Sequence, residues 1–171
     1  VKQFAKETLQ PKYYYFAWAN RLILYYLKTG RSNIALYEVE KMLKEAQEED
    51  NKTGLLYCYN IMSQIYTIKN FDVMASEWRQ KEIELTEKYK LENYNISNTY
   101  AQLASYYTTH HQPELAVKAL EKAVRTANSA SHKILAKLAY VDYYSESGDF
   151  PAAEKMLKEC RELFDQDKRL D

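Results

Sequence analysis

The sequence predicts an all-α protein built from about four helical hairpins, and three observations point to this fold class. The 171 residues contain only 3 Gly and 3 Pro, whereas sheet-rich folds use many tight turns that contain these residues. Apolar residues recur at spacings of three and four, as on the buried face of a helix. The same pattern returns along the chain, which indicates an internal repeat.

The repeat is defined by a tyrosine and an alanine. In each unit the second residue of an aromatic or near-aromatic pair is followed nine positions later by an alanine, with a polar turn between them. Successive alanines are 40, 41 and 37 residues apart. The pairs of Tyr and Ala are Tyr26 and Ala35, Tyr66 and Ala75, Tyr107 and Ala116, and Tyr144 and Ala153. Each unit is therefore expected to be a helix, a tight turn and a second helix.

The third unit shows the packing pattern most clearly. Its first helix carries a stripe of large and small residues, and its second helix carries a stripe that begins at Ala116 and continues through Leu120 and Ala123. An alanine that faces a tyrosine allows two helices to approach closely while the ring fills the remaining space. The stripe on the first helix consists of Tyr100, Leu103, Ala104 and Tyr107.

These residues resemble the tetratricopeptide repeat family, in which a large residue, Leu, a small residue and Tyr are followed by Ala, an apolar residue and Ala. The resemblance covers residues 12–168 and implies a right-handed solenoid of helix-turn-helix hairpins. The period exceeds the family's usual 34 residues, which predicts helices about one turn longer than the family standard. The first unit has Ile23 and Met42 where the family has small residues, and in the second unit the small position falls on Met74 or Ala75.

The predicted organisation is a single array over residues 1–171. Residues 1–10 are expected to end a preceding helix, and the repeats are expected at about 12–51, 52–92, 93–130 and 131–168. The segment looks like part of a longer array. An exposed end of such an array would favour self-association, because a neighbouring repeat would otherwise cover it.

Composition limits the classes of partner. Hydrophobic residues make up 46% and charged residues 28% of the chain, and no apolar run approaches the roughly 20 residues of a membrane-spanning helix. Lys plus Arg, 24 residues, equals Asp plus Glu, 24 residues, so the broad attraction that nucleic-acid binders use is absent. We expect a protein or peptide partner, no nucleic acid and no direct membrane contact in this segment.

Catalytic and metal-binding chemistry is not expected. His110 and His111 are adjacent, so they cannot chelate one ion as an i, i+4 pair would, and they are interpreted as exposed turn residues. His132 has no partner at ligand spacing. Nucleotide-binding, hydrolase and metalloprotease motifs are missing. The prediction is a non-enzymatic chain with no cofactor, and the widely separated Cys58 and Cys160 are interpreted as small buried hydrophobic residues.

Two further segments admit a binding or a structural interpretation. The acidic run 45–52 could form a carboxylate cluster but is interpreted as a solvated helix end. In the run Tyr13, Tyr14 and Tyr15, any helix must present at least one ring outward. Some exposed aromatic surface is therefore expected near the start of the chain, either as a partner site or as an uncovered end.

The resemblance implies a binding surface on the first helix of each hairpin, which lines the concave face of the solenoid in this family. The corresponding positions carry mostly neutral hydrogen-bonding groups and no Lys or Arg, which favours a peptide backbone over an anion and disfavours capture of a terminal carboxylate. The alternative is an exposed helix face without a ligand. The predicted residues, called the first-helix row below, are Asn20, Asn60, Gln64, Thr67, Ser105, Thr108, Asp142 and Ser145.

Two functional interpretations remain open. The first is an interaction scaffold or sensor segment of a larger bacterial signalling protein, because long-period, Tyr-rich and charge-balanced arrays are similar to regions that precede a membrane helix and an output domain. The alternative is a peptide-pheromone receptor module of a transcriptional regulator, and an enzyme is a remote third. The compartment is undecided: it would be periplasmic for a membrane-anchored sensor and cytoplasmic otherwise.

Overall fold

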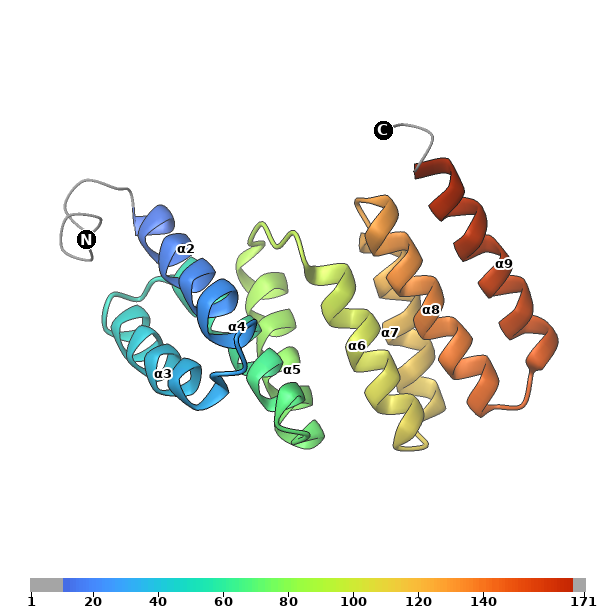
Figure 1. Cartoon of the computed structure of the whole chain (residues 1–171), viewed down its shortest axis with the longest axis horizontal. Coiled ribbons are helices and arrows are strands. Elements are labelled where there is room, and N and C mark those ends of the chain that lie inside the picture. Colours follow the sequence, from blue (N-terminus) through green and yellow to red (C-terminus); the bar gives the residue numbers. More distant parts are fainter. Residues whose placement is uncertain (1–10, 168–171) are drawn as a thin grey trace. The chain divides into compact units, whose positions relative to one another are not determined.

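The computed structural model describes residues 11–167, and all regular structure in that range is helical (Figure 1). The all-α prediction is therefore confirmed. The preceding helix predicted for residues 1–10 lies outside the described residues. The helices are α2 (Pro11–Arg21), which continues as the π-helix η1 (Leu22–Leu27), α3 (Ser32–Glu48), α4 (Lys52–Ile68), α5 (Asp72–Tyr89), α6 (Ile96–Thr109), α7 (Pro113–Thr126), α8 (Ala130–Glu146) and α9 (Phe150–Asp167).

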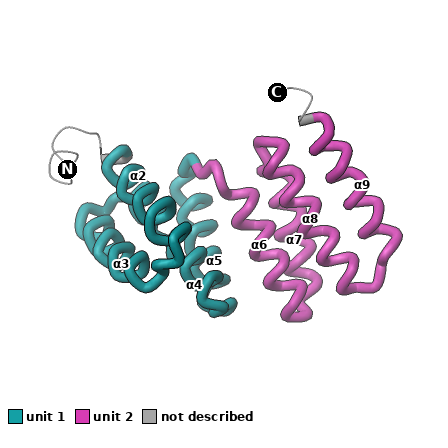
Figure 2. Tube along the Cα trace, viewed as in Figure 1, with its two compact units in different colours: residues 1–92 teal, residues 93–171 magenta. Residues whose placement is uncertain are grey.

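The helices form antiparallel hairpins that belong to two compact units, residues 1–92 and 93–171 (Figure 2). The first unit contains the hairpin of α2 and η1 with α3 and the hairpin of α4 with α5. The second unit contains the hairpins α6 with α7 and α8 with α9. Within each unit the first helix of one hairpin packs against the first helix of the next. A single array over the whole chain stays a prediction.

All four hairpins turn in the same way, at a residue with left-handed backbone. This residue is Gly30, Asn70, His111 or Gly148, with φ of 74°, 58°, 54° and 79° respectively. The next residue donates its amide to the carbonyl of the repeat tyrosine, for example Gln112 N to Tyr107 O at 2.9 Å and Asp149 N to Tyr144 O at 2.8 Å. This 6→1 bond is the helix-ending Schellman pattern, so the sequence period coincides with a repeated backbone turn.

The alanine that follows each turn lies at the helix-helix contact. Ala35 and Ala116 are fully buried, and Ala75 and Ala153 are 1% and 7% exposed. In the second hairpin Met74 is 41% exposed, so Ala75 fills the small position that the sequence left undecided. In the first hairpin, Ile23 lies in the π-helical turn η1, a widened turn of the kind that accommodates an extra residue.

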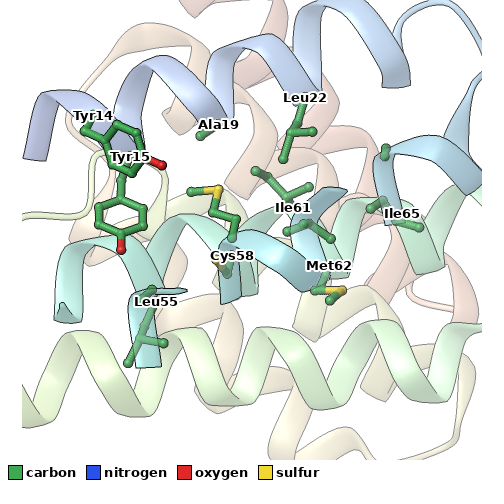
Figure 3. Close-up of a cluster of buried hydrophobic side chains, with 13 residues drawn as sticks. Tyr14, Tyr15, Ala19, Leu22, Leu55, Cys58, Ile61, Met62 and Ile65 are labelled. Atoms are coloured by element: carbon green, nitrogen blue, oxygen red, sulfur yellow. The ribbon is translucent and has the colours of Figure 1, made fainter. Parts of the chain in front are cut away.

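Tyrosines at the start of α2 anchor the core of the first unit. Figure 3 shows Tyr14 and Tyr15 beside the apolar side chains of α2 and α4. Tyr15 is fully buried and donates its hydroxyl to Glu49 at 2.8 Å, and Tyr14 donates to Glu45 at 2.9 Å. The acidic run ends α3 with exposed residues, as interpreted, and its Glu45 and Glu49 carboxylates also accept hydrogen bonds from these two buried phenols. Tyr13 is 49% exposed, as expected for one ring of the run.

Candidate functional site

Ser105 and Asp142 are the clearest pair that the first-helix row brings together. They lie on the neighbouring helices α6 and α8, and the Ser105 hydroxyl favours the charged form of the Asp142 carboxyl. Partial desolvation of this carboxyl between the two helices raises its pKa, and the bond from Ser105 opposes that effect. The residue as a whole remains exposed. The pair therefore offers an accessible carboxylate that a partner's N–H groups could reach.

In the first unit the part of the row on α4 is bonded to α5, the second helix of the same hairpin. The Asn60 side-chain amide lies 3.3 Å and 3.4 Å from the two carboxylate oxygens of Glu82 on α5, and its oxygen accepts a bond of 2.7 Å from Gln64. Asn60 is therefore engaged on both its donor and its acceptor sides. Gln64 keeps an amide oxygen, and it is half-buried.

Thr67 is held in the same manner. Its hydroxyl accepts a bond of 2.6 Å from Arg79 on α5 and donates to Ser63 O at 2.8 Å. Arg79 is only 6% exposed, and burial lowers the pKa of its guanidinium while the carboxylates of Glu82 and Asp72 oppose the change. Buried charges are retained in proteins when they are paired and hydrogen-bonded. The row on α4 therefore also has a structural role, which is to satisfy two buried charges.

The remaining members of the row differ in accessibility. The Asn20 amide donates to Phe16 O of its own helix at 3.0 Å and is half-buried. Thr108 is 7% exposed, and its hydroxyl donates to Ala104 O at 3.0 Å. Ser145 is exposed near the end of α8. In the second unit, Ser105, Asp142 and Ser145 are therefore the accessible part of the row.

Arg79 and Glu82 were missed by the sequence reasoning. Both are buried, with Glu82 only 1% exposed. The available signal was their position, since they lie four and seven residues after Ala75, at the spacing of a buried helical stripe. Charged residues on such a stripe point to a buried polar network rather than to a solvated face.

The histidines behave as turn or core residues in the described part of the chain. His110 and His111 are exposed at the turn between α6 and α7, as predicted. His132 is buried, its Nδ1 lies 2.7 Å from Asn128 Oδ1, and its ring lies 5.0 Å from that of Tyr94. No group of three or more potential metal-ligating side chains occurs among residues 11–167. No helix in that range has the length and apolarity needed to cross a bilayer.

Two of the hollows in the described part of the chain lie in the second unit. One of about 270 Å³ lies at the turn end of the hairpins and includes Thr108 of the row, with His111 and Tyr143 in its wall. The other, of about 450 Å³, lies between α7 and α9 over α8, on side chains outside the row. We call it the α7–α9 groove; its lining consists of Glu121, Val124, Arg125, Lys137, Tyr140, Tyr144 and Met156.

Comparison with solved structures finds the same architecture in another protein. The chain is similar to nearly identical TPR-like repeats of a Podosopora anserina protein described as a putative kinesin light chain, with a TM-score of 0.68 and 17% identity. The similarity covers 98% of this chain and 84% of that one. No protein-family model and no curated protein matches the chain.

At 17% identity this similarity shows a shared fold and nothing more. It agrees with the helical hairpins and the alanine contacts described above. The chain is therefore an all-α solenoid of the tetratricopeptide-like class. Stacked repeats of this class offer extended surfaces.

Proposed function

We propose that this chain is a protein-protein or peptide interaction module whose first-helix row contacts an extended segment of the partner. The observation that carries the proposal is the exposed Asp142 carboxylate, whose charged form is favoured by Ser105 of the adjacent first helix. Oriented carboxylate, hydroxyl and amide groups suit the N–H and C=O groups of an extended peptide backbone. The equal numbers of acidic and basic residues support a partner without a strong net charge.

The parent protein is proposed to be a bacterial signalling protein in which this module is the scaffold or sensor segment. The support is the composition and the long repeat period of the chain. The full-length sequence tests this proposal directly. A membrane-spanning helix followed by a kinase or DNA-binding domain is the expected arrangement, and a parent protein without any output domain would contradict it.

The binding proposal is tested by selecting peptide ligands from a library of random sequences. The library is displayed and selected on the immobilised chain, and the affinities of the selected peptides are measured by calorimetry. The double variant Asp142→Ala with Ser145→Ala removes exposed groups whose side chains do not fill the core. We expect this double variant to weaken the binding free energy of the selected peptides by about 1–2 kcal/mol, as for the loss of hydrogen bonds to a charged group.

A matched control is Glu154→Ala with Lys158→Ala on α9, where both side chains are exposed. These changes should leave the affinity within about 0.5 kcal/mol, the usual range for surface changes away from a site. Equal affinities for the two double variants would overturn the role of the first-helix row. Thermal unfolding of both variants checks that the fold is intact.

A further inference from the structure

Helix α9 lies at the end of the second unit, beyond α8 (Figure 1). Among the described residues it packs against α8 alone, whereas the second helix of the preceding hairpin, α7, packs against both α6 and α8. In the first unit α3 packs in the same way against η1 and α4. The repeat allows these second helices to be compared position by position, since Ala35, Ala116 and Ala153 are equivalent.

Positions of a second helix that the following helix covers are apolar. Leu120 of α7 and Val39 of α3 occupy one such position, and both are fully buried. Their equivalent on α9 is Leu157, which is 38% exposed. About two turns later, Ala46 of α3 is fully buried and its equivalent Phe164 is 51% exposed. Helix α9 therefore has the apolar side chains of a covered helix without a described helix over them.

The last helix of the first unit, α5, is different at the same two positions. It carries Arg79 and Thr86 there. Arg79 donates to the Thr67 hydroxyl at 2.6 Å, and the Thr86 hydroxyl donates to Glu82 O at 2.8 Å. These polar groups are bonded within their own unit. An apolar face is therefore not a general feature of the last helix of a unit.

The exposed apolar residues of α9 lie along one line of the helix. Phe150, Leu157 and Phe164 are spaced seven residues apart, and seven residues make about two helical turns. On one side of this line, Ala153 and Cys160 are buried against α8. We call Phe150, Leu157 and Phe164 the α9 stripe. The stripe is symmetric about Leu157, because a phenylalanine stands at the same distance on either side of it.

Two charges of opposite sign border the stripe on its open side. At about 100° per residue, Glu154 and Arg161 lie about 60° and about 40° around the helix from Leu157, in the same direction. Both side chains are exposed. Glu154 precedes Leu157 in the sequence, and Arg161 follows it. One half of the stripe therefore has an acidic border and the other half a basic one.

Two copies of this helix would complement each other if they ran antiparallel. With a two-fold axis at Leu157, each Phe150 would pack on the partner's Phe164. Glu154 lies three residues before Leu157 and Arg161 four residues after it, so Glu154 and the partner's Arg161 would differ by only about 1.5 Å in height. A parallel pair would instead bring like charges together, which is unfavourable across an interface.

The other charged groups of this hairpin do not oppose the antiparallel arrangement. Lys158 and Asp165 lie about 100° and about 80° around α9 from Leu157, outside the line of contact. Lys133 and Glu146 are exposed at opposite ends of α8, so an antiparallel pair would place Lys133 at the same end as the partner's Glu146. The remaining described charges of α9 are Lys155 and Glu162, on its far side, and Glu159, which is paired with Lys137.

From these observations we propose that this chain forms a symmetric dimer in which two copies of the α9 stripe pack antiparallel about a two-fold axis at Leu157. Burial of the apolar side chains drives the association, and the pairs of Glu154 with Arg161 set its direction. A two-fold contact uses the same surface on both copies, so it closes at the dimer. The stripe contains no residue of the first-helix row, so each proposal can fail without the other.

The test is sedimentation equilibrium of the whole chain at a series of concentrations. We expect only monomer and dimer, with a Kd on the order of 100 µM, because a contact between two helices is small for a specific interface. A chain that stays monomeric at about ten times this concentration would overturn the proposal and leave the stripe to a different protein segment. Oligomers that keep growing beyond the dimer would also overturn it, since they require a head-to-tail contact.

A substitution at the axis connects the dimer to the stripe. Leu157→Glu would place two carboxylates opposite each other, and it should raise the Kd of the dimer by about tenfold or more. Leu115→Glu is the matched control, because Leu115 of α7 is 43% exposed and lies outside the stripe. It should leave the Kd unchanged, and thermal unfolding of both variants checks the fold. Equal Kd values for the two variants would overturn the interface.

The antiparallel direction is tested by exchanging the border charges. Glu154→Arg alone and Arg161→Glu alone should each weaken the homodimer several-fold, because each puts like charges in contact. In a mixture of these two variants every such contact is between unlike charges, so native mass spectrometry should find the mixed dimer in excess of random exchange. Both residues are exposed, which keeps the test decisive if Leu157→Glu does not fold. A random distribution of the three dimers would overturn the proposed pairing.

Discussion

Gly54 of α4 lies directly against the ring of Tyr15 of α2. A Cβ atom added to Gly54 would stand 2.9 Å from Tyr15 Cδ1 and 3.0 Å from Ala46 Cβ. Since Tyr15 is fully buried and bonded to Glu49, its ring has little freedom to withdraw. The absence of a side chain at this position therefore sets how closely α2 and α4 approach.

The first prediction follows from this contact. Ala is favoured over Gly in a helix interior by about 1 kcal/mol, so propensity alone would make Gly54→Ala stabilising. The close contact with Tyr15 makes the substitution destabilising instead. We expect Gly54→Ala to lower the free energy of unfolding by about 1–3 kcal/mol, as for overpacked cores. Urea denaturation measures it, with the exposed Glu84→Ala on α5 as the control. An increase in stability for Gly54→Ala would contradict the packing.

The second prediction concerns the alkaline limit of stability. Burial and the bond to Glu49 raise the pKa of Tyr15 above its ordinary value of 10.0. A raised folded-state pKa gives stability that is complete below the unfolded-state pKa and is lost as the pH rises above it. The chain should lose stability above about pH 10, and Tyr15→Phe should lose less of it over the same interval. Parallel pH profiles for the two proteins would contradict the prediction.

The third prediction concerns the turn between α6 and α7. His111 has φ of 54°, and equivalent turns use Gly30 or Gly148. Left-handed backbone is unfavourable for a residue with a Cβ and neutral for glycine. His111→Gly should raise the free energy of unfolding by about 0.5–1 kcal/mol. His111→Ala, which keeps the Cβ, is the control and should not stabilise the chain.

The fourth prediction concerns the alanine contacts that define the repeat. Ala116 is fully buried where α7 meets α6. Ala116→Leu should destabilise by about 1–3 kcal/mol, because the added carbons have no space. Lys118→Leu adds apolar bulk at an exposed position of the same helix and should change stability by less than about 0.5 kcal/mol. Equal thermal shifts for the two variants would show that the alanine is not a packing position.

The fold was predictable from the sequence because the same physical constraint recurs. Each hairpin needs a tight turn with left-handed backbone and a buried alanine after it, so each has a tyrosine and an alanine nine residues apart. Tyr107, which accepts the bond that closes the turn, and the buried Ala116 are the clearest example. The long period agrees with helices of 17 or 18 residues such as α4 and α5, whereas α6 and α7 have 14 residues each and do not show the predicted extra turn. The turn, the alanine contact and the repeat period can all be recognised from the spacing of residues along the sequence.

The candidate site was less predictable because it depends on pairs of residues from different helices. Spacing places Asn60 on the first-helix row, but it does not reveal that Glu82 of α5 engages the Asn60 amide. Likewise, spacing did not reveal that the acidic run accepts hydrogen bonds from Tyr14 and Tyr15, because these tyrosines lie more than thirty residues earlier. The groove beside Met156 appears only when the packing of three helices is known.

In the proposed complex a partner segment binds along the first-helix row. The most direct measurement is an NMR titration of the chain with the peptides that were selected on it. We predict that the largest amide shifts occur at the row on α6 and α8, around Ser105, Asp142 and Ser145. Shifts confined to the second helices α7 and α9, or no shifts at all, would contradict the account.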